Sequence, residues 1–214
     1  MYSNILMARP AHFPRERILA AARAIVAERS PAEMTVAALS GRLKAPVGSI
    51  YHRYPSRDLL LADLWLSTIE SFQPEFLHHL EGEDPIEAGL AAVHFACCWV
   101  RNHSQEAQLL LRYRREDFIR GAWAEPYRSR AELLKRQGSA GIRAYCRRLY
   151  GDASARHLRR VRFALSDVPL AALRSSIEVR ARMPGDLEAL VQDTCRHVLA
   201  RGSSSPAARG SQRR

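Results

Sequence analysis

The sequence predicts an all-α protein of about nine helices, and three observations lead to this fold class. Apolar residues recur at spacings of three and four along most of the chain, which is the period of an amphipathic helix. No segment alternates apolar and polar residues between turn signals, as a half-buried strand would. Apolar residues make up 47% of the 214 residues, which is enough to bury the core of one domain or of two small ones.

Two amphipathic helices are predicted in the first third of the chain. The first spans about residues 15–29, and the second begins after Ser56, which is placed to cap it. Apolar side chains at helical spacing define both helices. They are Ile18, Ala22, Ile25 and Val26 in the first, and Leu61, Trp65, Ile69, Phe72 and Phe76 in the second.

Between these two helices, residues 35–55 divide into two short helical pieces. Thr35 is in the N-cap position of a helix that runs to about Leu43. Lys44 begins a polar turn, and Pro46 then opens the second piece. Two short helices joined by so tight a turn have the spacing of a helix-turn-helix.

Later helices are predicted from their start signals and apolar stripes. Asp84 is an N-cap, Pro85 follows in the first turn, and Glu87 stands three residues after the cap. A long helix is predicted over about residues 125–150, and the last one over about residues 187–198.

Two positions are expected to disturb these later helices. Leu158, Val161 and Leu165 repeat helically up to Pro169, which lacks an amide donor, so this helix should end or kink there. The glycine pair in residues 138–141 lies inside a helical pattern and is interpreted as a packing or kink site.

The net charge of +11 and the pI near 10.2 point to a polyanionic partner. Residues 1–60 carry nine basic and four acidic side chains, and residues 201–214 carry four basic and none acidic. A GC-rich genome would explain the preference for Arg over Lys but not this asymmetry. The small, polar and basic residues 201–214 are expected to form a disordered tail.

Four cysteines in a chain of this length are too few and too irregular for a disulfide framework, which favours a reducing cytoplasm. Neither a signal-peptide core nor an uncharged stretch long enough to span a bilayer is present in the sequence. No membrane association is therefore expected. Met1 and Met7 are both possible starts, because the first six residues join no pattern.

The run AALSGRLKAPVGSIYHRYPSRDLLL, residues 37–61, resembles the DNA-binding region of the TetR family of transcriptional regulators. Lys44, Pro46 and Arg53 depart from that pattern, because the family usually has a turn glycine, a capping Ser or Thr, and an apolar or aromatic residue there. The residues that carry the resemblance are Thr35, Leu39, Gly48, Ser49, Ile50, Tyr51, Tyr54, Arg57 and Leu60.

The second short helix is the candidate reader of DNA, because a narrow helix fits the major groove. Val47 and Ser49 are candidates for base contacts. Tyr51 could instead pack in the core, His52 could be an exposed bystander, and Gly48 could either weaken the helix or permit close approach to DNA. The full set of candidate DNA-binding residues is Thr35, Arg42, Lys44, Val47, Gly48, Ser49, Tyr51, His52 and Arg57, with Arg53 as a further phosphate contact.

Aromatic residues concentrate in the middle of the chain, where the resemblance implies a small-molecule effector enclosed by helices. Ordinary core packing is the alternative for each of them. The candidate ligand-binding residues are Phe72, Phe76, His94, Phe95, Trp99, Tyr113, Trp123 and Tyr127. His94, Cys97 and Cys98 share nearly one helical face, but a core histidine beside two buried thiols is commoner than a metal site, so no metal and no cofactor is predicted.

The function predicted is that of a homodimeric, cytoplasmic DNA-binding regulator, a repressor released from its operator by a hydrophobic or aromatic effector. Sequence motifs of hydrolases, nucleotide-binding loops and zinc proteases are absent, so no enzyme is predicted; the alternative is an all-α enzyme or metal-binding protein that uses the aromatic pocket. The expected domains are residues 13–55 for DNA and 56–200 for effector and dimerisation, and the resemblance places the dimer surface at about 153–168 and 186–200.

Overall fold

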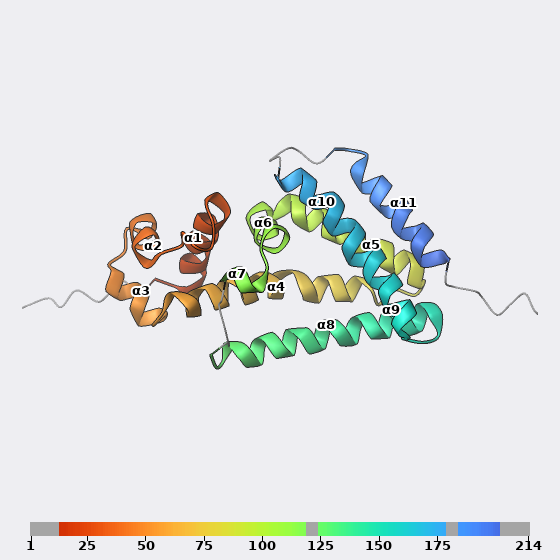
Figure 1. The fold of residues 1–214 in the computed structure, drawn as a ribbon, viewed down its shortest axis with the longest axis horizontal. Coiled ribbons are helices and arrows are strands. Elements are labelled where there is room, and N and C mark those ends of the chain that lie inside the picture. The colour runs from red at the N-terminus through yellow and green to blue at the C-terminus, as the bar shows by residue number, and fades with distance from the viewer. Residues whose placement is uncertain (1–12, 119–123, 179–183, 202–214) are drawn as a thin grey trace, which may run out of the picture. The chain divides into compact units, whose positions relative to one another are not determined.

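The computed structural model describes residues 13–118, 124–178 and 184–201, and every regular element in these ranges is helical (Figure 1). The all-α prediction is therefore confirmed. The expectations for Trp123, for the two possible starts and for the tail beyond residue 201 lie outside the described residues. In chain order the elements are α1 (Arg15–Glu28), α2 (Val36–Leu43), α3 (Val47–Arg53), α4 (Arg57–His79), α5 (Pro85–Asn102), α6 (Ser104–Arg112), α7 (Arg115–Phe118), α8 (Tyr127–Tyr150), α9 (Ala155–Arg162), the π-helix η1 (Phe163–Asp167), α10 (Val168–Glu178) and α11 (Leu187–Ala200).

The helices of the described residues number ten when the unbroken run α9–η1–α10 is counted as one rod, against about nine predicted. The short helices α6 and α7 have no counterpart in the prediction, because neither is long enough to leave a repeating apolar stripe. None of the helices so described is long and apolar enough to cross a membrane.

The helices form two compact units. The N-terminal unit holds the described residues up to Ser67 together with those between Tyr113 and Arg128, and the C-terminal unit holds the rest. The chain thus passes from one unit to the other within α4, twelve residues beyond the boundary expected after residue 55.

A buried polar network explains why the first turns of α4 belong to the N-terminal unit. Asp63 of α4 is only 3% exposed. Its carboxylate accepts hydrogen bonds from Arg15 of α1, at 2.7 Å and 2.6 Å, and from the Tyr54 hydroxyl at 2.7 Å. Burial, and then this hydrogen bond, raise the pKa of Tyr54 far above its usual value. The network joins α1, the end of α3 and α4, and it lies beside an apolar core of α1 to α4.

In the C-terminal unit, α5, α10 and α11 lie side by side, and α8 packs along the second half of α4 (Figure 1). The two glycines that the sequence marks as a packing or kink site allow α8 to approach α4 closely. A Cβ on Gly141 would stand 2.7 Å from a methyl group of Leu77, and one on Gly138 would stand 3.1 Å from the Gln73 side-chain oxygen. Both glycines lie inside the continuous helix α8, so the packing interpretation is the one that the structure supports.

Of the two alternatives for Pro169, an end of the helix is wrong. The helix continues through α10, and the disturbance is the π-helical stretch η1 directly before the proline. There the backbone N–H of Val168 donates to the carbonyl of Phe163, five residues earlier. In an α-helix the proline ring would clash with the carbonyl four residues back, and the wider π turn relieves that clash.

Candidate functional site

The helix-turn-helix is held together by local hydrogen bonds. The Thr35 hydroxyl accepts from the backbone N–H of Ala38 at 3.1 Å and so caps α2, as predicted. Lys44 ends α2 in the left-handed conformation, with φ of 52°. In the turn that follows, the Ser40 hydroxyl donates to the Ala45 carbonyl at 2.6 Å, and the Ala45 N–H returns a bond to the Ser40 carbonyl at 3.1 Å. These bonds set where α3 begins, directly after its N-cap residue Pro46.

One face of α3 anchors the helix and the rest is open. Ile50 is fully buried, whereas Val47 is 42% exposed and Tyr51 is 48% exposed. His52 is also exposed, and Ser49 is half-buried. The alternative that Tyr51 packs in the core is therefore wrong. A Cβ at Gly48 would meet no described atom within 4 Å, so packing does not require glycine there.

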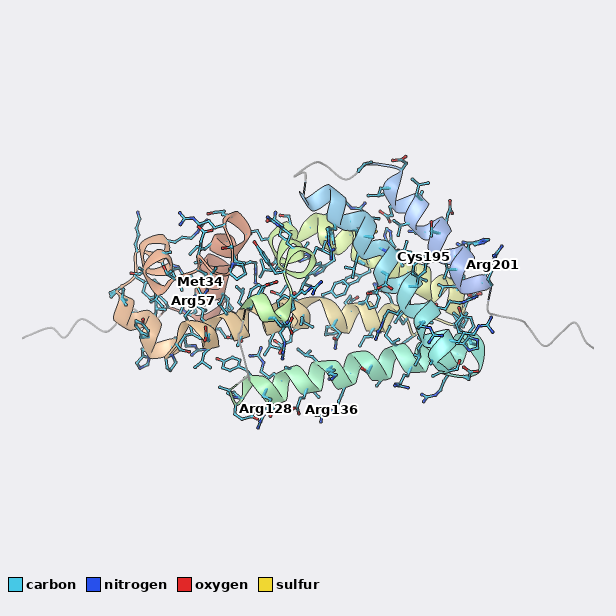
Figure 2. The ribbon with its side chains drawn as sticks, viewed as in Figure 1. Met34, Arg57, Arg128, Arg136, Cys195 and Arg201 are labelled. Atoms are coloured by element: carbon cyan, nitrogen blue, oxygen red, sulfur yellow. The ribbon has the colours of Figure 1, made fainter. Side chains whose placement is uncertain are left out.

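The basic residues around α3 divide into two groups. Arg42 forms a paired contact with Glu28 of α1, at 2.7 Å and 2.6 Å, and this hydrogen bond holds the pKa of Glu28 below its usual value. Arg57 donates to the carbonyls of Met34, at 2.7 Å, and Pro31, so it fastens α4 to the loop before α2 (Figure 2). Lys44 and Arg53 are exposed and have no such partner among the described residues.

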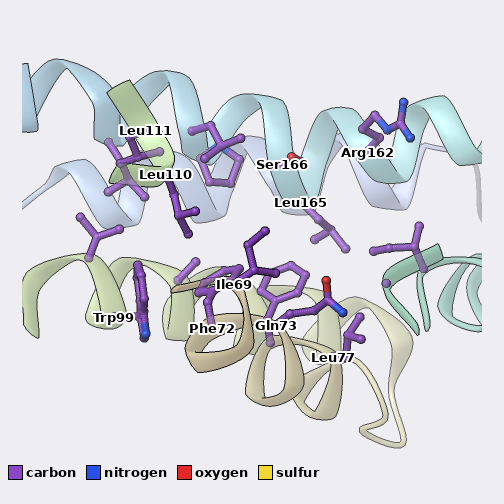
Figure 3. Close-up of a pocket in the computed structure, with 18 of the residues that line it drawn as sticks. Ile69, Phe72, Gln73, Leu77, Trp99, Leu110, Leu111, Arg162, Leu165 and Ser166 are labelled. Carbon is purple, nitrogen blue, oxygen red and sulfur yellow. The ribbon is translucent and has the colours of Figure 1, made fainter. Parts of the chain in front are cut away.

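A cavity of about 430 Å³ lies inside the C-terminal unit (Figure 3). Its walls come from α4, α5, α6, α8 and the rod α9–η1–α10. Its size suits a small organic molecule. The apolar lining is formed mainly by Ile69, Phe72, Phe76, Leu77, Trp99, Val100, Leu110, Leu111, Ile142, Leu158, Leu165, Leu170 and Leu173, and the polar lining by Gln73, Ser139, Arg143, Arg162 and Ser166.

The structure brings three of the eight predicted ligand residues into this lining, namely Phe72, Phe76 and Trp99. Phe95 lies behind the lining, stacked on Phe72 with ring centroids 5.7 Å apart. Tyr113 and Tyr127 belong to the N-terminal unit, where Tyr113 donates to the Arg29 carbonyl at 3.3 Å.

His94 is neither in the cavity nor in the core, and both expectations for it are wrong. Its side chain is 58% exposed and its Nδ1 meets the carboxylate of Glu188. Cys97 lies on the inward-facing stripe of α5, and His94 lies about 60° away from Cys97 around the helix, at the exposed edge of that stripe. No group of three or more His, Cys, Asp or Glu side chains in the described ranges could hold a metal ion.

Sequence reasoning missed the polar lining of the cavity. Gln73 could have been found, because it follows Ile69 by four residues and so continues one side of the α4 stripe. Ser166 follows Arg162 by the same spacing on the predicted helix, but both are polar, so the apolar stripe of that helix does not mark them. Ser139 and Arg143 had no signal, since only the packing of α8 makes them part of the wall.

Comparison with known proteins adds a family match for the helix-turn-helix. Residues 18–64 match the family model described as bacterial regulatory proteins, tetR family. This range covers most of α1, the helix-turn-helix and the first turns of α4. No curated protein matches the sequence of this chain.

Solved structures of transcriptional regulators are similar in fold to most of this chain. A regulator from Rhodococcus sp. Rha1 is 20% identical with a TM-score of 0.68, over 91% of this chain and 100% of that chain. The TetR family regulator PfmR from Thermus thermophilus is 18% identical with a TM-score of 0.63, over 86% and 97%. FadR from Bacillus subtilis, in complex with stearoyl-CoA, is 13% identical with a TM-score of 0.66, over 88% and 99%. The TM-scores establish a common fold, and sequence identities this low establish nothing beyond the fold.

Proposed function

We propose that residues 18–64 form the helix-turn-helix domain of the tetR family of bacterial regulatory proteins. On this premise, the chain regulates transcription by binding DNA. In this proposal a cytoplasmic homodimer binds double-stranded operator DNA and represses transcription. A small hydrophobic or aromatic effector then enters the cavity and releases the DNA. The proposed activity requires no cofactor and involves no enzymatic step.

The open face of α3 is the observation that carries the DNA-binding proposal. Val47 and Tyr51 are large, exposed and anchored by a fully buried Ile50 on the same short helix. Such a helix can enter a major groove, where Val47 and Ser49 would contact base edges. Exposed Lys44 and Arg53 would contact phosphates beside the groove and hold the register of the protein on the duplex.

The test begins with binding sequences selected in vitro from random duplexes. Arg53→Ala should weaken binding to every sequence alike and reduce the dependence of log affinity on log salt by about one unit. Val47→Ala should instead change the ranking of sequences. The control is Arg147→Ala, which removes an exposed arginine at the end of α8. An unchanged salt dependence in a folded Arg53→Ala protein would rule out the proposed contact.

The cavity supports the effector half of the proposal. Its lining is mostly apolar, and it is built from Phe72, Phe76 and Trp99 among others. FadR from Bacillus subtilis, which shares the fold, was solved in complex with stearoyl-CoA, so long-chain apolar molecules belong in a first screen. An effector that weakens DNA binding must itself bind the DNA-bound protein less tightly by the same factor.

Filling the cavity tests this half. Leu110→Trp adds a large side chain to the lining and should abolish the thermal shift that an apolar ligand produces, while affinity for the selected DNA stays the same. Leu133→Trp is the matched control, because it makes the same change at an exposed leucine of α8 that lies outside the lining. Equal loss of ligand and DNA binding in folded Leu110→Trp would contradict the separation of reader and sensor.

Exposed apolar side chains on the last helices support a dimer. Phe163, Leu170 and Leu190 are 49%, 39% and 58% exposed, and they belong to η1, α10 and α11. Burying such side chains between two copies would be favourable. A two-fold dimer would place two α3 helices in successive major grooves, about 34 to 36 Å apart, and would recognise a palindrome.

A further inference from the structure

Four side chains on α5 and α11 form a compact cluster around the sulfur of Cys98. His94 Nε2 lies 3.4 Å from Cys98 Sγ, and Arg101 Nη2 donates to the same sulfur at 3.0 Å. On the far side, His94 Nδ1 and Arg101 Nη1 both meet Glu188 of α11, the latter at 2.7 Å. The cluster lies outside the lining of the cavity and outside the helix-turn-helix.

The order of these contacts determines where the protons are. An ionised carboxylate only accepts hydrogen bonds, so His94 Nδ1 must carry its proton toward Glu188. Whenever this ring carries a single proton, its Nε2 is free of hydrogen, faces the Cys98 thiol and can accept the thiol proton. Burial opposes ionisation of Glu188, but the hydrogen bonds from His94 and Arg101 outweigh it and hold the pKa of this carboxyl below its usual value. The thiol of Cys98, the base His94 and the carboxylate of Glu188, which orients that base, are thus connected in this order.

The other three cysteines have no such surroundings. Cys97, Cys146 and Cys195 are buried, whereas Cys98 is only partly buried. Burial raises the pKa of the Cys97 thiol to about 12 and that of Cys195 to about 11. Cys195 also donates to the Ala164 carbonyl at 2.8 Å. Among the four cysteines, Cys98 is the one that is partly exposed and whose sulfur contacts both an imidazole and a guanidinium.

We propose that Cys98 is a covalent modification site for small, uncharged α,β-unsaturated carbonyl compounds. The thiol proton passes to His94 Nε2, and the sulfur forms a bond to the β-carbon of the compound. The electron pair of the carbon–carbon double bond moves to the α-carbon, which takes the proton back from His94. The product is a thioether, with no oxidant and no leaving group. Arg101 stabilises the negative sulfur before the bond forms.

The probe for this proposal is N-ethylmaleimide, added to the native full-length chain at pH 7. Peptide mapping should place one rapid adduct on Cys98, formed about tenfold faster than the adduct of glutathione under the same conditions. Cys98→Ser should remove this adduct. Glu188→Gln and His94→Gln should each slow the reaction at Cys98 about fivefold or more, because the base is then misdirected or missing.

A matched control separates activation of the thiol from loosening of the two helices. Glu87 of α5 and Arg196 of α11 form another ion pair between these helices, at 2.5 Å. Glu87→Gln removes that pair without touching the cluster, and the rate at Cys98 should stay at the wild-type value. A wild-type rate equal to that of glutathione, or an equal slowing in Glu87→Gln and Glu188→Gln, would overturn the proposal. Neither outcome bears on DNA binding, so this site and the proposed function are tested separately.

Discussion

Lys44 ends α2 with a left-handed backbone, at φ of 52° and ψ of 41°. This conformation costs a residue with a side chain about 1 kcal/mol, and glycine avoids the cost. The side chain of Lys44 is exposed beside α3, where the proposed DNA phosphates would lie. A functional need for a cation would explain why this position departs from the turn glycine usual in the family.

Lys44→Gly should therefore raise the free energy of unfolding by about 0.5 to 1 kcal/mol and weaken DNA binding at low salt. Urea denaturation and a binding titration measure the two effects. Lys44→Ala is the control, because it removes the charge but keeps the Cβ; its DNA affinity should fall equally without any gain in stability. A gain of the same size in Lys44→Ala would show that the backbone is not the cause.

Asp63 is the residue on which the polar network of the N-terminal unit depends. Asp63→Ala should lower the free energy of unfolding by about 2 to 4 kcal/mol, because it leaves the Tyr54 hydroxyl and the Arg15 guanidinium without their buried acceptor. Tyr54→Phe removes only one bond and should cost about 1 kcal/mol. Chemical denaturation followed by circular dichroism distinguishes them, and equal losses would mean that the Arg15 contact contributes nothing.

Helices α5 and α8 meet where Gly89 faces Tyr145. A Cβ on Gly89 would overlap the Tyr145 hydroxyl, which donates to the Pro85 carbonyl at 2.8 Å. Tyr145 is 1% exposed, so its ring has little room to move. The hydroxyl therefore requires glycine at position 89, although glycine lowers the helix propensity of α5.

Gly89→Ala should destabilise the protein by about 1 to 3 kcal/mol, despite the better helix propensity of alanine. Tyr145→Phe in the same chain removes the overlapping oxygen and should recover part of the loss. Thermal unfolding of the four combinations gives the coupling energy between the two positions. Simple additivity of the two substitutions would contradict the clash.

At the scale of the whole molecule, α11 presents two different apolar positions. Leu190 is 58% exposed, whereas Val198 is partly buried and packs against the core of the C-terminal unit. Leu190→Glu should yield a folded monomer in sedimentation experiments, because it places a charge in the proposed dimer surface. Val198→Glu should instead lower the melting temperature, and Arg201→Gln is an exposed control with the same change of −1 in net charge. A wild-type monomer at micromolar concentration would remove the dimer from the proposal.

Local periodicity determined most of what the sequence predicts correctly. The stripe of Ile18, Ala22 and Ile25, the cap at Thr35 and the start at Asp84 act within one or two helical turns, so they can be read without the fold. The same holds for the helix-turn-helix, whose turn and capping residues are contiguous. These signals set the all-α class and place the exposed face of α3.

Tertiary packing decided the rest, because it depends on partners far apart in the chain. Arg42 and Arg57 were expected to face DNA phosphates, but Glu28, Pro31 and Met34 engage them within the N-terminal unit. Likewise, His94 contacts Glu188 of α11 outside the cavity lining. A charged side chain takes the partner that the fold brings within hydrogen-bond distance, and the spacing of residues along one helix carries no information about a partner on another.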